Sequence, residues 1–219
     1  MQLADLIEPR TTVVLVSEMQ RGIAGDRVQP ALSMLSDAVA ASGMIPRIAT
    51  LLDGARAAGS KVIHCTLQFR RDRAGVRIVS PLMAVTMKDP THLLEGSEDA
   101  QIIPEIGPAD FDIVAARIHG MSAFSGTELD AILRSLDTRT VIITGVSLNE
   151  AIIGASIEAV NLGYRVVIPR DGALGLPQSF AEDMLKHAYS LLAKITTTQE
   201  ILDVWAGSRG ADVSDGAAK

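Results

Sequence analysis

The sequence predicts a single α/β domain built on a doubly wound, mainly parallel sheet of about six strands with helices on both faces. Short apolar, β-branched runs recur along the chain, stretches with helical spacing lie between them, and glycines or capping residues mark the boundaries. Continuous apolar runs are typical of parallel strands that are covered on both faces. With 219 residues, 47% of them hydrophobic, the chain can bury the core of one such domain.

The expected strands, in chain order, are Thr12–Ser17, Lys61–Gln68, Ile113–Ala116, Val141–Val146, Val166–Pro169 and Ala193–Thr196. The expected helices between them are Ile45–Ala58, Thr127–Leu136, Asn149–Leu162 and Ser179–Leu192. Gly59 and Gly163 follow two of these helices, as glycine commonly does. Ser179 and Glu182 form a capping-box pattern at the start of the last one.

The end of the chain predicts a short helix, Gln199–Trp205, packed on the sheet and followed by a small, polar and mobile tail, Gly207–Lys219. The domain would then span residues 1–206. The segment Arg70–Pro108 interrupts the alternation and has no period, and connections of this length are usually functional or disordered. It is either a cap over the site or a dimer contact. The apolar run Val79–Met87 favours burial under a partner subunit, so we expect a homo-oligomer.

Composition excludes several classes of function. A net charge of −6 with 3% aromatic residues argues against nucleic-acid binding, which needs basic faces and stacking rings. No apolar run approaches the roughly 20 residues of a membrane span, and the N-terminus does not resemble a signal peptide, so a cytoplasmic location is expected. Cys65 is the only cysteine, which rules out an intrachain disulfide and a cysteine-based zinc cluster. No cofactor is expected.

The most informative stretch is Thr140–Ala151, which reads as a buried strand that passes through a glycine turn into a helix. Ser147 and Asn149 supply N-capping chemistry for that helix. The turn would lie at the carboxyl edge of the sheet, where ligands bind in open α/β folds. The free backbone N–H groups of a helix start suit an anion or an oxyanion.

Together with Thr12–Gln20 (TVVLVSEMQ) and Ser122–Leu129 (SAFSGTEL), this stretch resembles the isochorismatase-like cysteine hydrolase family, and the likeness extends from about Thr11 to Trp205. The resemblance implies that family's fold, with a non-proline cis peptide near Val146–Ser147. It also implies a site made of Asp in a strand-end D-x-Q, Lys before the S-A-F-x-G-T run, and Cys at the helix start. By that alignment this chain has Glu18, no lysine, and Ala151.

Glu18 follows four apolar strand residues and would reach the open end of the sheet. It is either a general base, its pKa raised by partial burial, or a carboxylate paired with Arg21 or a backbone N–H. The resemblance favours the base, since Glu keeps the family's carboxylate. The Gln20 amide could hold a substrate or order the loop.

Arg117 and His119 lie around the position of the family's lysine. Alignment without gaps from Phe124 puts Ile118 there, and a shift of one residue puts Arg117 there. Arginine can stabilise an anion, and histidine can shuttle protons, although a loop histidine bonded to nearby backbone is an equal alternative. With Glu18 these two form the expected catalytic set.

The expected substrate-binding residues are Gln20, Ser147, Ala151, Phe124 and Arg71. Arg71 belongs to the run Arg70–Arg73, whose arginines would suit an anionic substrate or simply a solvated loop. The same run offers one carboxylate and no histidine before His92, so a zinc site like that of the family's nicotinamidase branch is not expected.

Ala151 has no reactive atom, so the family's thioester chemistry is not available at the helix start. Cys65 lies in a strand interior, and Ser122, Ser125 and Ser147 lack a nucleophile-elbow motif. The isochorismatases proper also lack the cysteine and cleave an enol ether by proton transfer and water attack. We therefore expect a small-molecule hydrolase in which Glu18 activates water. The alternative is a catalytically degenerate member that binds a small ligand or acts as an oligomer.

Overall fold

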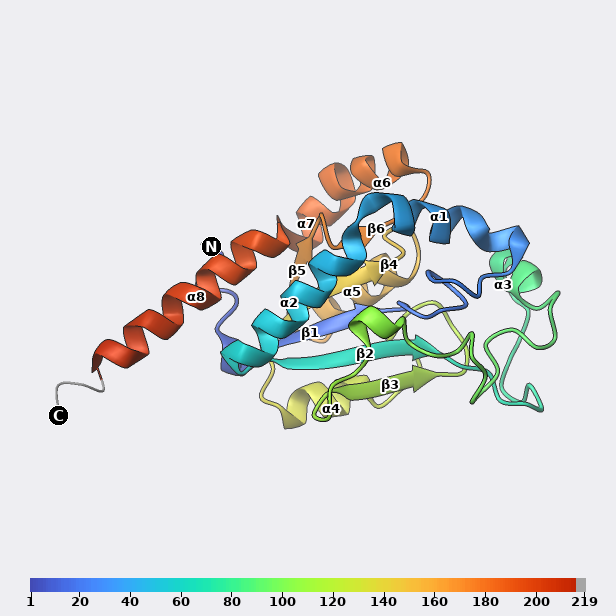
Figure 1. Cartoon of the computed structure of the whole chain (residues 1–219), viewed down its shortest axis with the longest axis horizontal. Coiled ribbons are helices and arrows are strands. Elements are labelled where there is room, and N and C mark those ends of the chain that lie inside the picture. The colour runs from blue at the N-terminus through green and yellow to red at the C-terminus, as the bar shows by residue number, and fades with distance from the viewer. Residues whose placement is uncertain (216–219) are drawn as a thin grey trace.

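A computed structural model describes the backbone of residues 1–215 and the side chains of residues 1–207. Its strands are β1 (Thr12–Ser17), β2 (Lys61–Leu67), β3 (Ile113–Arg117), β4 (Thr140–Val146), β5 (Arg165–Pro169), β6 (Ala173–Leu174) and β7 (Ala193–Thr196). All of the strand pairings among them are parallel, in the order β3-β2-β1-β4-β5-β7, and β6 pairs with the end of β4 (Figure 1). The predicted doubly wound parallel sheet is confirmed.

The centre of the sheet is the point at which the chain changes direction. After β1 the chain adds β2 and β3 on one side, and it then returns to place β4 on the other side of β1. Val14 of β1 accordingly pairs with Val62 on one side and with Ile142 on the other. Ligands bind outside the carboxyl ends of strands at such a switch point, which here lies between β1 and β4.

The α-helices are α1 (Ser33–Ser42), α2 (Met44–Ala58), α3 (Pro81–Thr86), α4 (Leu129–Ser135), α5 (Ala151–Asn161), α6 (Gln178–Met184), α7 (Ser190–Leu192) and α8 (Thr198–Asp215). A π-helical turn, Leu185–Tyr189, joins α6 to α7, and single 3-10 turns lie at Pro9–Thr11, Pro30–Leu32 and Pro104–Ile106. Figure 1 shows α2 in front of the sheet and α5 behind it.

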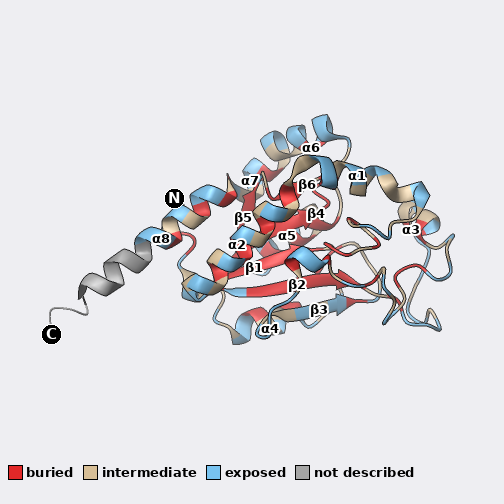
Figure 2. Ribbon diagram, viewed as in Figure 1, coloured by how far each residue is buried: buried red, intermediate tan, exposed pale blue. Residues whose placement is uncertain are grey.

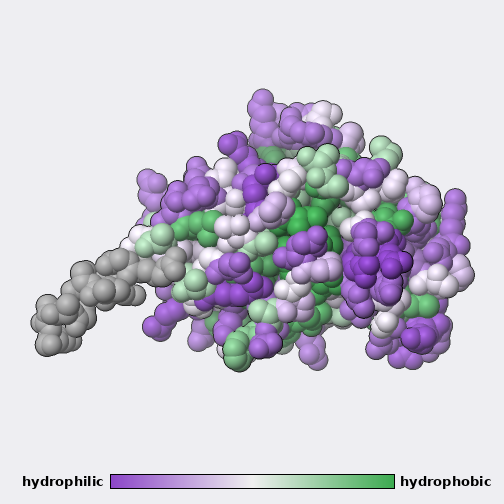
Figure 3. Space-filling view, in the orientation of Figure 1, coloured by the Kyte–Doolittle hydropathy of each residue, from purple (hydrophilic) through white to green (hydrophobic). Residues whose placement is uncertain are grey.

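Successive side chains of the strands point to opposite faces of the sheet, and each face packs against a hydrophobic core of its own. Val14 and Val16 of β1 face α1, α2 and α8, where Trp205 is fully buried. Val13 and Leu15 face α4, α5 and α6 on the other side. Strands β1, β4 and β5 are buried almost throughout, whereas the edge strand β3 is partly exposed (Figure 2). In the view of Figure 3, hydrophobic residues gather toward the middle of the surface and hydrophilic ones surround them.

The expected strands agree with the structure to within one residue at each end, but β6, α1 and α3 were not expected. Two predicted caps are wrong. The N-cap of α5 is Glu150, without a side-chain cap, because Asn149 Oδ1 accepts from the N–H of Leu176 instead (3.1 Å). Helix α6 begins at Gln178 after Pro177, and no side chain caps it.

Helix α8 is longer than the expected Gln199–Trp205 and continues to Asp215. The expected mobile tail, Gly207–Lys219, falls almost entirely outside the residues whose side chains are described. No helix in the described part of the chain is both long enough and apolar enough to cross a bilayer.

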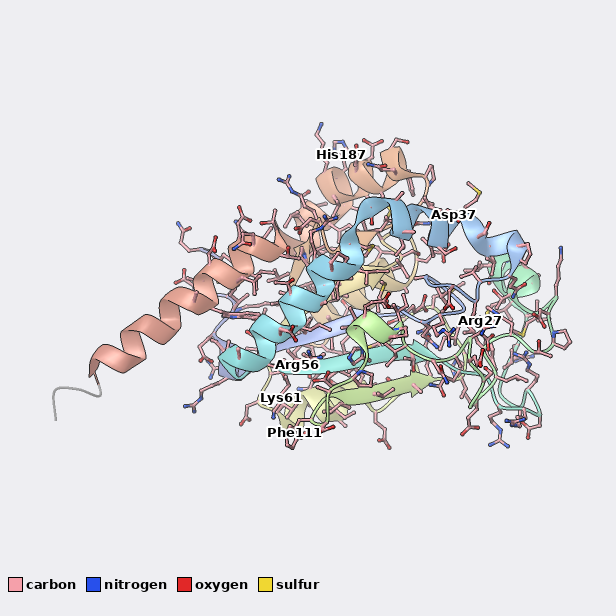
Figure 4. The ribbon with its side chains drawn as sticks, viewed as in Figure 1. Arg27, Asp37, Arg56, Lys61, Phe111 and His187 are labelled. Atoms are coloured by element: carbon pink, nitrogen blue, oxygen red, sulfur yellow. The ribbon has the colours of Figure 1, made fainter. Side chains whose placement is uncertain are left out.

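A partly buried ionic cluster joins α2 to the edge of the sheet. Arg56, labelled on α2 in Figure 4, donates to Asp112 just before β3 (2.6 Å). The fully buried His64 of β2 lies 3.4 Å from the same carboxylate. Burial lowers the pKa of His64 more than Asp112 raises it. This cluster holds strands and helix together rather than lining a cavity.

Gly145 has a backbone conformation (φ +105°) that suits glycine, and a Cβ there would lie 2.3 Å from the carbonyl oxygen of Ser17. We expect Gly145→Ala to lower the free energy of unfolding by at least about 2 kcal/mol, because β1 and β4 are central strands that cannot separate freely. Gly59→Ala is the matched control, since Gly59 also has positive φ (+87°) but faces open space. Equal losses in urea unfolding of the two variants would contradict the steric account.

Candidate active site

A cavity of about 300 Å³ lies at the carboxyl edge of the sheet, the end toward which the arrowheads of β1, β2 and β3 point in Figure 1. Its polar lining residues are Glu18, Thr86, His92, Arg117, Ser147, Asn149 and Glu150. Its walls are mainly apolar, from residues such as Ile23, Leu35, Leu67, Met83, Leu93 and Met121. The cavity is large enough for a small metabolite and has only a few polar groups to orient it.

Glu18 is the first residue after β1, and its backbone turns sharply there. It has a positive φ of 51°, while its N–H still donates to the carbonyl of Cys65 (2.9 Å). Such a conformation costs a non-glycine residue on the order of 1–3 kcal/mol and is found preferentially at functional sites. The turn carries the Glu18 carboxylate to the cavity, where it accepts a hydrogen bond from Arg117.

Arg117 is the last residue of β3, and its side chain is only 3% exposed. Besides the ion pair with Glu18, its Nε donates to the carbonyl of Gly120 (3.2 Å). Ile118, which alignment without gaps placed at the family's lysine, is 38% exposed and does not line the cavity. Arg117 is therefore the cation that the edge strand brings to Glu18.

The turn between β4 and α5 forms the opposite wall. Ser147 and Ala151 both line the cavity, so Glu18 and the helix start share one site. The peptide bond between Val146 and Ser147 is cis, as the resemblance implied. The carbonyl of Ser147 accepts from the N–H groups of Glu150 (3.1 Å) and Ile152 (3.0 Å), which fixes the first turn of the helix.

Gln20 does not line the cavity, and the expectation that it binds substrate is not supported by its position. Its side chain is fully buried, donates to the carbonyls of Leu67 (2.9 Å) and Ala100 (2.8 Å), and accepts from the N–H of Leu67 (2.7 Å). Every polar atom of the amide is thus used by backbone. Gln20 orders the loop, which was the other interpretation of this residue.

Three other expected site residues also lie outside the cavity lining. His119 is half-buried, with its ring facing Gly126. Phe124 stacks on Tyr164 at 6.3 Å between ring centroids and packs into the core behind the sheet. Arg71 is exposed on its loop.

The neighbours of Arg71 are engaged elsewhere as well. Arg70 pairs with Asp72 at 2.7 Å, and both are more than half exposed. Arg73 lies over the ring of Phe69 (4.9 Å from the centroid) and donates to the carbonyl of Pro90 (2.6 Å). The expected anion-binding role of this run therefore has no support from its geometry.

The segment Arg70–Pro108 covers the cavity in part. Leu82, Met83 and Thr86 of α3 line it, which supports the cap interpretation for that helix. Val79, just before the helix, is 82% exposed. The alternative role in a dimer contact, and with it homo-oligomerisation, stays a prediction.

Sequence reasoning missed two titratable residues of the cavity. His92 is buried, its Nδ1 lies 3.3 Å from a carboxylate oxygen of Asp99, and burial lowers its pKa. Glu150 is half-buried, and burial, reinforced by the charge of Glu18, raises its pKa. Its position directly before Ala151 was the available signal, but a polar residue at a helix start usually has a capping role.

Among the described residues, no group of three His, Cys, Asp or Glu side chains could hold a metal ion.

Cys65 is fully enclosed in β2, and burial raises the pKa of its thiol to about 12. We expect thiol reagents at neutral pH to leave the folded protein unlabelled and to modify Cys65 only after denaturation, because the thiolate is the reactive form. Mass spectrometry of native and urea-treated samples measures this. Rapid stoichiometric labelling of the native protein would show that Cys65 is accessible after all.

These features define an α/β protein with a mainly apolar cavity at the switch point of a parallel sheet. The family model of the isochorismatase domain matches residues 12–200, and the chain belongs to the isochorismatase family.

Two relatives extend this likeness over most of the chain. The isochorismatase family protein YecD of Escherichia coli is 23% identical over 205 residues, which cover 90% of this chain and 97% of the relative. The ureidoacrylate amidohydrolase RutB of Agrobacterium fabrum is 27% identical over 189 residues, 80% of this chain and 81% of that protein. Among solved structures, an isochorismatase family protein from Desulfovibrio vulgaris superposes with a TM-score of 0.76 at 25% identity, covering 90% of this chain and 99% of its own.

Proposed function

We propose that this isochorismatase-family protein hydrolyses a small molecule by direct attack of water, which Glu18 activates as general base, without a cysteine nucleophile. The observation that carries the proposal is that the Glu18 carboxylate reaches the same cavity as the helix start at Ala151. The acid of the family's pattern is thus present at the site, while the position of its nucleophile is occupied by a methyl group.

In the proposed reaction the carboxylate of Glu18 takes a proton from a water molecule as the water oxygen bonds to the electrophilic carbon of the substrate. The guanidinium of Arg117 balances the negative charge of Glu18 and holds its side chain in place. The first turn of α5 suits the oxygen that becomes negatively charged, because the positive end of the helix dipole lies there. Ala151 leaves room for the substrate where a thiol would otherwise stand.

The lining of the cavity bears on the class of substrate. Arg117 is already paired with Glu18, and the arginines of the run 70–73 do not line the cavity. An anionic substrate would therefore meet the Glu18 carboxylate and no unpaired arginine within the described lining. We infer a substrate without net negative charge whose apolar part fits against Leu35, Met83 and Leu93. The likeness to the ureidoacrylate amidohydrolase makes an amide or ureido group the first linkage to test.

A panel of neutral amides, ureido compounds, esters and enol ethers tests the proposal. Wild-type protein is expected to hydrolyse at least one class, and Glu18→Gln is expected to hydrolyse that class with a kcat about 10²–10⁴-fold lower. A kcat that Glu18→Gln leaves undiminished would show that another group activates the water. No turnover at all, together with saturable binding of a panel member, would favour the ligand-binding alternative, which Ala151 also fits.

A further inference from the structure

Glu150 is the one carboxylate of the described cavity lining that no side chain or backbone group engages. Glu18 is paired with Arg117, whereas the side chain of Glu150 forms no hydrogen bond or ion pair with any described residue. It stands at the N-cap of α5, directly before Ala151, and its carbonyl accepts the helical hydrogen bond from Gly154 (3.1 Å). A half-buried carboxyl group left free in a mainly apolar cavity is available to a substrate.

The surroundings of Glu150 favour its protonated form. The titratable or charged groups that share the cavity with it are Glu18 at the end of β1, Arg117 at the end of β3 and His92 in the loop after α3. Burial raises the pKa of Glu150 most, and the charge of Glu18 raises it further. Arg117 is committed to Glu18. Two carboxyl groups in one site with such different environments are the usual arrangement of an acid and a base.

We propose that Glu150 is the general acid of the reaction and protonates the leaving group while Glu18 activates the water. This inference rests on the proposed function. In the hydrolysis of an acyl substrate the water oxygen bonds to the acyl carbon, and its proton passes to the Glu18 carboxylate. The bond from the acyl carbon to the leaving nitrogen or oxygen breaks, and that atom takes the proton of Glu150. Glu18 then releases its proton and Glu150 regains one from solvent, which restores both groups.

A matched pair of substrates separates this role from a structural one. A neutral methylamide and a 4-nitrophenyl ester carrying the same acyl group differ in the leaving group. Nitrophenolate can depart without taking up a proton, whereas the methylamine nitrogen must be protonated to depart. Glu150→Gln is expected to slow methylamide hydrolysis about 100-fold or more, the usual range for general acid catalysis, and ester hydrolysis less than about 5-fold. Glu128→Gln is the control, because Glu128 is an exposed carboxylate at the N-cap of α4. It should change neither rate.

The pH dependence gives a second readout. Because the acid acts in its protonated form, kcat for the methylamide should fall as pH rises through the pKa of Glu150, and this fall should disappear in Glu150→Gln. Carbon-13 NMR of labelled carboxyl groups measures the pKa of Glu150 without a substrate. A raised pKa that drops in Glu18→Gln is expected, and an ordinary pKa would overturn the inference.

The outcomes distinguish this inference from the function on which it rests. If Glu150→Gln lost equal activity on both substrates, or none, the role of Glu150 would be overturned. The proposed function would still stand as long as Glu18→Gln remained strongly impaired. Failure of the wild-type protein to cleave any member of the panel, these two substrates included, would defeat the proposed function and the acid with it. Circular dichroism of each variant establishes that it is folded.

Discussion

Glu18→Gln should lower kcat by about 10²–10⁴-fold, the contribution expected of a general base, and leave the fold intact. Glutamine keeps the shape of the side chain and an oxygen that can still accept from Arg117, but it cannot take a proton from water. Steady-state kinetics on the best panel substrate and near-ultraviolet circular dichroism measure the two effects. The Glu128→Gln control carries the same chemical change on an exposed residue.

A loss confined to KM would contradict the assignment, because a base acts on the chemical step and its removal must lower kcat. A variant that unfolds would say nothing about catalysis by itself, so activity is compared only between samples with matching spectra. Glu18→Asp offers an independent comparison, since it restores the family's aspartate and retains a carboxylate.

Arg117→Met should lower the free energy of unfolding by about 3 kcal/mol, because it leaves the Glu18 carboxylate without its partner at a site where the two side chains are 3% and 14% exposed. The double variant Glu18→Gln/Arg117→Met should recover part of that loss, since it buries no unpaired charge. Arg70→Met is the control for an exposed ion pair with Asp72 and should cost less than about 1 kcal/mol. Urea unfolding of the wild type, Glu18→Gln, Arg117→Met and the double variant gives the coupling energy between the two side chains.

If Arg117→Met and Arg70→Met reduced stability equally, the ion pair at the site would be no stronger than a surface pair. The account of how Glu18 is held would then be wrong. The same variants report on activity, because a Glu18 side chain that is no longer held by Arg117 should react more slowly even where its carboxylate remains.

The strands and the position of Glu18 could be predicted because they depend on short-range patterns. Apolar β-branched runs such as Thr12–Ser17 are specific enough to set strand ends to within one residue, and a carboxylate after such a run must lie near the sheet edge. The turn around Ala151 was likewise predictable, since a strand, a glycine turn and a helix start occur there in succession.

The directions of individual side chains depend on contacts that are distant in sequence. Gln20 is turned inward by carbonyls 47 and 80 residues away, and no local pattern contains that information. Arg117 and His119 could be separated only in the structure, because β3 ends at Arg117, whose side chain reaches Glu18, whereas His119 lies in the loop beyond the strand. Glu150 was overlooked because its importance comes from having no partner, which only the packed structure shows.

The central claim is that water attacks the substrate directly, and the most direct test is the intact mass of the wild-type protein quenched during turnover in ¹⁸O-labelled water. The account predicts a protein mass unchanged from the resting state, with the label present in the product. An adduct of substrate mass on Ser147, on Cys65 or on either cavity carboxylate would contradict it, since that result would mean that a protein nucleophile, and not water, makes the first bond.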